Sequence, residues 1–106
     1  MDSVKLLVLY PQPKDNVVFD HDYASHLDMF HQKLSIPRTG ILPYTVTKFV
    51  AVDDEIPKYY QMFSMVFSSM NELHKTLSSE EMQSVASDAV RISSGGAPNI
   101  LIGADG

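Results

Sequence analysis

Hydrophobic residues fall in separate blocks along the chain, and the spacing inside each block indicates a strand or a helix. The run VKLLVLY at residues 4–10 is rich in Val and Leu and ends at PQP, which predicts a strand from a buried sheet. The next block repeats every three or four residues, as one face of a helix does, and Asp15 or Asn16 can cap its start. The members of this apolar stripe are Phe19, Tyr23, Leu27, Phe30 and Leu34.

The middle of the chain has the composition of an antiparallel hairpin. The segment SIPRTG, with Pro37 and Gly40, ends the helical pattern. Residues 41–52 and 57–68 are then rich in β-branched and aromatic side chains, and the short polar sequence DDEI separates them. We therefore expect two neighbouring antiparallel strands connected by the DDEI loop.

Two helices, or one interrupted helix, are expected between this hairpin and the last strand. SMNE from Ser69 and SSEE from Ser78 each place a serine three residues before a glutamate, which is the capping-box pattern of a helix start. The sequence SSGG then ends the helical segment, and PNILIG at residues 98–103 predicts a final strand.

The resulting order, β-α-β-β-α-β, predicts an α+β protein with a four-stranded antiparallel sheet and helices on one face. In the strand at 57–68, however, both alternating sets of side chains are apolar, whereas a sheet with one wet face alternates more cleanly. One set is Tyr59, Phe63, Met65 and Phe67, and the other is Tyr60, Met62 and Val66. We therefore predict a homodimer through the sheet face, in which another copy of the chain covers the second apolar face.

Composition and charge narrow the possible partners. The 106 residues, 44% of them hydrophobic, are enough for the core of a single domain and too few for two. A formal net charge of -5 at pH 7 argues against nucleic acid and membrane partners, because such binders collect Lys and Arg. No cysteine is present, which excludes thiolate chemistry. The apolar run near the N-terminus is too short for a signal peptide or a spanning helix, so we expect a cytoplasmic protein.

Several segments together resemble the EthD family of small proteins associated with ethyl tert-butyl ether degradation. They are VKLLVLYPQPKD, FDHDY with the following H and KL, YTVTKFVAV, PKYYQMFSMVFSSMNEL, SSEEMQSVASDA and SGGAPNILIG. The resemblance covers nearly the whole chain, so it implies a single EthD-like domain over residues 1–106. It also implies a ferredoxin-like fold of the dimeric α+β barrel type, in which two sheets pack face to face.

The resemblance also implies a general type of function. Proteins of the barrel superfamily include cofactor-free monooxygenases and polyketide cyclases, although the biochemical role of EthD itself is undefined. We therefore expect a small-molecule degradation or biosynthesis protein that holds an apolar or aromatic compound between the first helix and the sheet. No cofactor and no metal are implied.

Three histidines occur at five-residue spacing in FDHDYASHLDMFHQK, and this spacing argues against a metal site. A step of five residues turns about 140° around a helix, so His21, His26 and His31 point in different directions. Only His26 is well placed beside the apolar stripe to face the sheet. We take His26 as the candidate catalytic acid or base, and the alternative is a boundary residue that is hydrogen-bonded to backbone or water.

The first helix of the family carries a Tyr, then a His a few residues later, then a Pro and a Leu. Here Tyr23 and His26 are about one residue closer together than in the family, and Asp28 and Met29 stand where the Pro and the Leu would follow. Leu27 or Asp28 could instead occupy the histidine position of the family. Asp22, one turn before His26, could orient its imidazole or form an ordinary surface pair. The candidate ligand-binding residues are Tyr23, Phe30, Tyr60 and Met62, with Tyr10 as a further hydroxyl.

Other motifs indicate no activity. SGGAPNIL precedes a strand instead of opening a helix, so it is not a phosphate loop, and neither HExxH nor GxSxG occurs. The same order of elements builds RNA-recognition modules, but the acidic charge argues against that class. Two function classes remain: a protein that acts on or binds a small apolar molecule, and a non-catalytic dimeric accessory or binding module of an oxygenase system.

Overall fold

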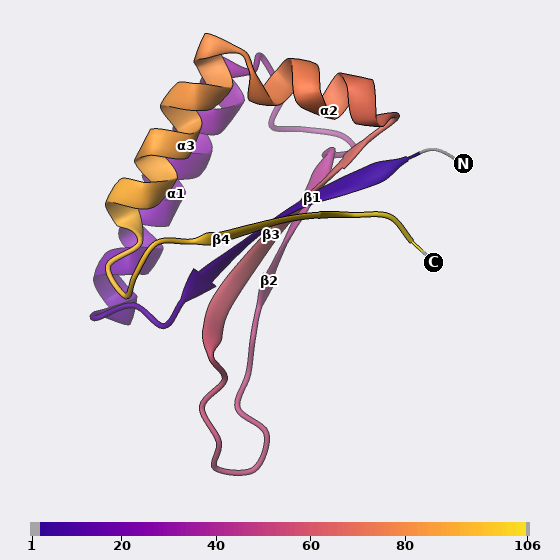
Figure 1. The fold of residues 1–106 in the computed structure, drawn as a ribbon. Helices are drawn as coiled ribbons and strands as arrows, with labels where there is room; N and C mark the ends of the chain where they lie inside the picture. The colour runs from indigo at the N-terminus through magenta and orange to yellow at the C-terminus, as the bar shows by residue number, and fades with distance from the viewer. Residues whose placement is uncertain (1–2, 106) are drawn as a thin grey trace.

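The computed structural model describes residues 3–105, and residues 1, 2 and 106 lie outside the described part. One face of an antiparallel sheet is covered by helices, and α1 and α3 lie side by side (Figure 1). The elements are β1 (Val4–Pro11), α1 (Asn16–Lys33), β2 (Tyr44–Lys48), β3 (Tyr59–Phe67), α2 (Met70–Leu77), α3 (Glu80–Ile92) and β4 (Asn99–Gly103). The strand order β2-β3-β1-β4 places β1 and β3 in the centre. The predicted α+β fold is confirmed.

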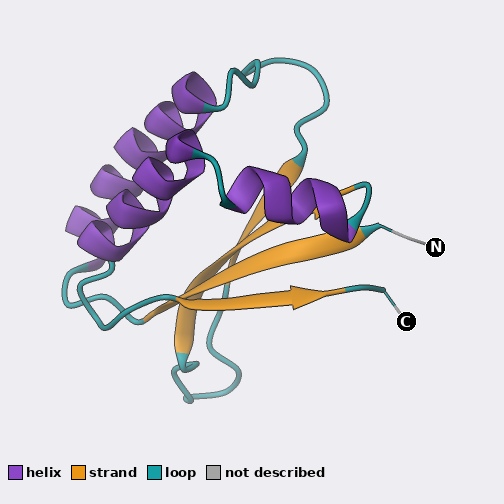
Figure 2. Ribbon diagram, turned by 45° about the horizontal axis from the view of Figure 1, so that its top comes forward, coloured by secondary structure: helices purple, strands orange, loops and turns teal. Residues whose placement is uncertain are grey.

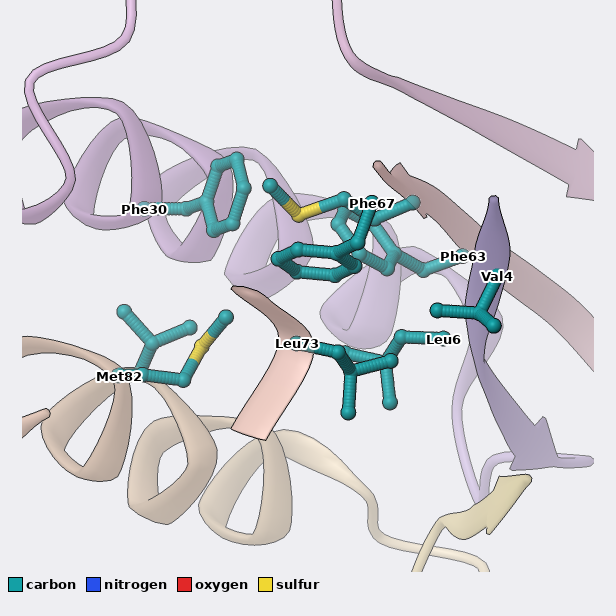
Figure 3. Packing of buried hydrophobic residues seen from close by; sticks show 9 residues of the cluster. Val4, Leu6, Phe30, Phe63, Phe67, Leu73 and Met82 are labelled. Atoms are coloured by element: carbon teal, nitrogen blue, oxygen red, sulfur yellow. The ribbon is translucent and has the colours of Figure 1, made fainter. Parts of the chain in front are cut away.

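The core lies between the central strands and the helices. Alternate residues of β1 face the helices, so Val4, Leu6 and Tyr10 are buried while their neighbours are only partly so. Each helix adds apolar side chains to this layer, and the close view shows them gathered around Phe67 of β3 (Figure 3). The helix residues labelled in this view are Phe30 of α1, Leu73 of α2 and Met82 of α3.

Polar side chains cap the start of each described helix. The Asp15 carboxylate accepts hydrogen bonds from the backbone N–H groups of Val17 and Val18, and Ser69 accepts one from Glu72, as the capping box predicts. The predicted cap at Ser78 is wrong by one residue, because Ser79 accepts the hydrogen bond from Met82 at the start of α3. The backbone N–H of Ser78 instead donates to His74 and completes the last turn of α2.

The second strand is shorter than the predicted segment 41–52. β2 pairs with β3 from Tyr44 to Lys48, and just before it the carbonyl of Pro43 accepts a hydrogen bond from the N–H of Val66. Beyond β2, residues 49–58 form an extended arm, which projects from the sheet (Figure 1). At its tip Asp53 adopts a positive φ of 56°, which closes a turn between the bridged residues Val52 and Glu55. The predicted hairpin is therefore present, with a shorter first strand and a longer loop.

A register shift changes where Tyr60 points. Tyr10 pairs with Gln61 and Pro11 pairs with Tyr59, so Tyr60 is an extra residue in β3. An extra residue of this kind turns its side chain to the same face as its neighbour, and the Tyr60 ring contacts Phe19 of α1. The prediction that Tyr60 shares a face with Met62 is therefore wrong, because the strict alternation of strand side chains ends at this shift.

The second face of the sheet carries no helix in the described part of the chain (Figure 2). Strands β1, β3 and β4 place apolar side chains on this face, and two of them, Val66 and Leu101, are 49% and 55% exposed. The other apolar residues of this face are Leu7, Leu9 and Met62, which the register places beside them. Within residues 3–105, no helix has the length and the apolar composition needed to cross a bilayer.

Candidate functional site

The candidate site centres on His26, which α1 holds against α3. His26 is buried, and its Nδ1 lies 2.8 Å from Oδ2 of Asp88 on α3. The other oxygen of Asp88, Oδ1, accepts a hydrogen bond of 2.8 Å from Nε of Arg91, one turn further along α3. The three residues therefore form a chain that runs from the surface guanidinium through the carboxylate to the buried imidazole.

Burial and the hydrogen bonds to Asp88 determine the protonation state of His26. Burial lowers the pKa of His26 more strongly than the hydrogen bond to Asp88 raises it, so the imidazole is neutral at pH 7. Burial raises the pKa of Asp88, but the hydrogen bonds from His26 and Arg91 outweigh it, and the pKa lies below the ordinary value. Because Asp88 is a carboxylate that can only accept, the Nδ1 of His26 carries the proton, and Nε2 keeps a free lone pair.

His26 also forms part of the wall of a cavity of about 160 Å³ between the helices and the sheet. Apart from His26 on α1 and Tyr10 on β1, the side chains of this wall are apolar. The wall residues that are exposed mark the mouth, between α3 and β4, and they are Ala86, Val90, Ala97 and Ile100. A dry cavity of similar volume in another protein binds benzene, so the space fits one small apolar ring.

The arrangement is suited to proton transfer in an apolar environment. A neutral imidazole whose Nδ1–H is held by a carboxylate can take a proton at Nε2, and the carboxylate stabilises the imidazolium that forms. In residues 3–105 no three His, Asp or Glu side chains lie together as metal ligands would. The chemistry that the His26–Asp88 pair itself can supply is acid–base chemistry.

The ligand-binding residues predicted from the sequence lie in three different places. Phe30 is part of the cavity wall together with His26. Tyr23 and Tyr60 belong to a neighbouring aromatic cluster around Phe19. Met62 of β3 lies opposite Leu9 of β1 and Thr47 of β2, and its side chain is on the face of the sheet away from the helices. The structure thus brings Phe30 together with His26, and it does not bring the other three to the cavity.

The rival positions for the family histidine have surface or packing roles. Asp28 is exposed and pairs with Arg38, while Leu27 packs against the cluster of Tyr10 and Phe19. The carboxylate that orients His26 is Asp88 and not Asp22. The prediction that only His26 faces the sheet is wrong, because His31 is also buried and reaches Tyr44 of β2. His31 is a structural residue, since its Nδ1 and Nε2 are hydrogen-bonded to the carbonyl of Ile36 and the hydroxyl of Tyr44.

Asp88 and Arg91 are functional candidates that no pattern in the sequence identifies. They lie three residues apart on α3, which is an ordinary spacing for a helix ion pair, and 62 residues separate Asp88 from His26. Only the packing of α1 against α3 brings the carboxylate of Asp88 next to the imidazole of His26. For Tyr10 the sequence does hold a signal, because the alternation of side chains along β1 places it on the same face as Leu6.

The fold and the cavity define a ferredoxin-like α+β protein with an apolar space beneath its helices, and comparison with solved structures agrees. A dimeric ferredoxin-like protein of unknown function from Jannaschia sp. CCS1 has a TM-score of 0.71 at 12% identity, covering 97% of this chain and 99% of that one. SnoaB from Streptomyces nogalater, a cofactor-independent oxygenase, has a TM-score of 0.60 at 10% identity, covering 99% and 94%. At these identities the likeness concerns the fold alone.

Within this class the chain resembles the EthD family. An EthD family protein from Bacillus halodurans C-125 is 28% identical, with a TM-score of 0.79, and the match covers 98% of this chain and 99% of that one. The resemblance to EthD proteins that the sequence predicts is therefore confirmed. No protein-family model matches the chain. No curated protein matches it either.

Proposed function

We propose that the protein binds a small, neutral, apolar or aromatic molecule in the cavity beneath its helices and that His26 acts on it as an acid or base, without a metal or a cofactor. The observation that carries this proposal is the neutral imidazole of His26, oriented by Asp88, on an otherwise apolar wall. An apolar wall disfavours a charged ligand, because a charge that enters without a partner loses its hydration. Phe30 would contact the same molecule.

The comparisons support the same type of chemistry. The similar EthD family protein belongs to a family connected with the degradation of a small ether, and SnoaB is an oxygenase that works without a cofactor. Both share the fold in which the cavity of this chain lies, so a small-molecule activity that uses only side chains is consistent with the architecture.

Toluene tests the binding part of this proposal, because it matches the cavity in size and polarity. We expect toluene to shift the amide resonances of Ala86, Ala89 and Ile100 in a titration followed by nuclear magnetic resonance, because these residues form the wall. The variant Ala24→Leu, on the exposed face of α1, should bind equally well. If toluene shifts none of the wall resonances at saturation, the cavity is not a binding site and the proposal fails.

Deuterium exchange into cyclohexanone tests the acid–base part. The hydrogens on the carbon next to the carbonyl exchange with deuterium from heavy water when a base removes them. We expect this exchange to be faster with wild-type protein than with the same concentration of free imidazole. The variant His26→Gln should lose this excess, while His74→Gln, at an exposed histidine on α2, should retain it. Toluene binding with no excess exchange would show a non-catalytic binding module, which is the accessory function considered above.

The uncovered face of the sheet supports a homodimer as the working form. Val66 and Leu101 on that face are about half exposed, and the similar protein from Jannaschia is described as dimeric. We expect light scattering at micromolar concentration to give twice the chain mass of 11.8 kDa, and Val66→Glu to shift it towards the single chain. The control Val17→Glu, at an exposed residue of α1, should leave the mass unchanged. A mass of one chain for wild type would contradict the dimer.

A further inference from the structure

We propose that Tyr10 is the hydrogen-bond donor of the cavity and that it binds a carbonyl oxygen of the ligand, so that the ligands are small apolar ketones with a hydrogen on the neighbouring carbon. This inference rests on the proposed function, because it needs the cavity to be a binding site. It adds the polar group by which the ligand is recognised and oriented towards His26.

The position of Tyr10 carries this inference. Tyr10 points from β1 towards the helices, it is 1% exposed to solvent, and it forms part of the cavity wall with His26. The Tyr10 hydroxyl has no hydrogen-bond partner within residues 3–105. Two other polar atoms without a partner, the Tyr23 hydroxyl and the Gln61 amide nitrogen, are fully enclosed by protein, whereas the Tyr10 hydroxyl is not. Since almost no part of Tyr10 meets the outer solvent, the open space beside its oxygen is the cavity.

The other hydroxyls near the site are less suitable. The Tyr60 hydroxyl already donates to the Asp20 carboxylate and lies close to the Lys48 ammonium group. The Tyr23 ring stacks on Phe19, and its hydroxyl is enclosed by protein instead of bordering the cavity. Tyr10 is therefore the tyrosine of this cluster whose donor is free for a ligand in the cavity.

The Tyr10 hydroxyl is a stable donor at neutral pH. Burial raises the pKa of Tyr10 well above its ordinary value, and the negative charge of Asp88 raises it further. Tyr10 on β1 and His26 on α1 both form part of the wall of the same cavity. A ligand that bridges the two polar groups would thus meet a donor at Tyr10 and an acceptor at Nε2 of His26.

A ketone with an adjacent C–H matches this donor and acceptor. Nε2 of His26 would take the proton from the carbon, and the electron pair of the broken C–H bond would form a carbon–carbon double bond. The carbonyl oxygen would gain the negative charge, which the O–H of Tyr10 stabilises by a hydrogen bond. Returning a proton or a deuteron from His26 to the same carbon regenerates the ketone, so no oxidant or reductant is needed.

Two molecules of the same shape separate this inference from simple apolar binding. Cyclohexanone and methylenecyclohexane differ only in the carbonyl oxygen, which is replaced by a CH₂ group. We expect wild-type protein to bind cyclohexanone roughly fivefold more tightly, as one neutral hydrogen bond allows, after correction for the solubility difference of the two compounds. Tyr10→Phe should remove this preference and leave the affinity for methylenecyclohexane unchanged.

The same variant should affect the exchange reaction. We expect Tyr10→Phe to slow deuterium exchange into bound cyclohexanone at least roughly tenfold, because the developing oxyanion loses its donor. Tyr59→Phe is the matched control, since Tyr59 hydrogen-bonds to Asn99 and is not part of the cavity wall. The carbonyl ¹³C resonance of bound cyclohexanone gives a measurement on wild-type protein alone, and a downfield shift on binding supports the hydrogen bond.

Each outcome has a definite meaning. If neither compound binds, the proposed function fails, and this inference fails with it. If both bind with equal affinity and the carbonyl resonance does not move, the cavity is a binding site but Tyr10 is not its donor. If the ketone preference survives Tyr10→Phe and disappears in His26→Gln, the imidazole is the donor, which also overturns the inference.

Discussion

Filling the cavity with a larger side chain should stabilise the fold and remove ligand binding at the same time. Ala86 lies at the mouth of the cavity on α3, and Ala86→Leu adds three carbon atoms that can enter it. A void of about 160 Å³ in a core costs up to about 4 kcal/mol, at roughly 24 cal/mol per Å³. This figure is the upper limit of what a filling substitution can regain.

The expected gain is smaller because a leucine fills only part of the space. Burying three carbon atoms is worth about 2.4 kcal/mol at most, at roughly 0.8 kcal/mol for each. Since Ala86 is at the exposed mouth, about half of this area is removed from water, and we expect an increase of about 1 kcal/mol in the free energy of unfolding. For a chain of this length the melting temperature should rise by about 4–8 °C.

Urea unfolding and toluene titration on the same samples measure the two effects together. Ala24→Leu is the matched control, because Ala24 is exposed on α1 and the same substitution meets no cavity there, so the change should stay within about 0.5 kcal/mol. Ala86→Leu should weaken toluene binding at least tenfold, and Ala24→Leu should not. If Ala86→Leu changes neither the stability nor the affinity, the space beneath the helices is not an available cavity.

Three further predictions concern the histidine, metals and the core. Because the pKa of His26 is lowered in the folded state, its contribution to stability is complete above the ordinary histidine pKa of about 6.5, and it decreases as the pH falls below that value. Urea unfolding between about pH 7.5 and pH 5.5 should therefore show a loss that His26→Gln reduces and His74→Gln does not. Dialysis against a chelator should leave the melting temperature unchanged, and a fall that zinc reverses would contradict this. Leu73→Ala, at a fully buried residue of α2, should lower the free energy of unfolding by about 2–5 kcal/mol, whereas Leu42→Ala in an exposed loop should cost far less.

Elements with a strong local pattern could be predicted from the sequence. The apolar stripe through Phe19 and Phe30 gave the position of α1, and the serine at Ser69 gave the start of α2, because both signals depend only on neighbouring residues. Ser78 and Ser79 are both capping residues by type, so the one-residue error there reflects a choice that packing makes. The shortened β2 has a similar cause, since Val50 and Val52 favour a strand but find no partner strand in the described chain.

The candidate site could be predicted only in part, because its partners come together through tertiary packing. The angular position of His26 on α1 follows from helix geometry, and the structure places the ring inward as that geometry indicates. Its carboxylate partner, Asp88, could not be found in this way, because nothing in the local sequence distinguishes it from the other acids of α3. The side-chain direction of Tyr60 was also hidden, since a register shift depends on how two strands align.

The cavity itself follows from the size of a few side chains on α3 and the loop before β4. On α3 the cavity is bordered by Met82, Val85 and Val90 and by the two small residues Ala86 and Ala89. Protein interiors are otherwise close-packed, and a void here costs up to about 4 kcal/mol in a fold whose total stability is of the order of 5–15 kcal/mol. One larger side chain would recover part of that stability, so the small residues keep the cavity open at a cost in the free energy of unfolding. Because His26 is part of the wall of the same space, a binding function explains the small side chains more simply than poor packing does.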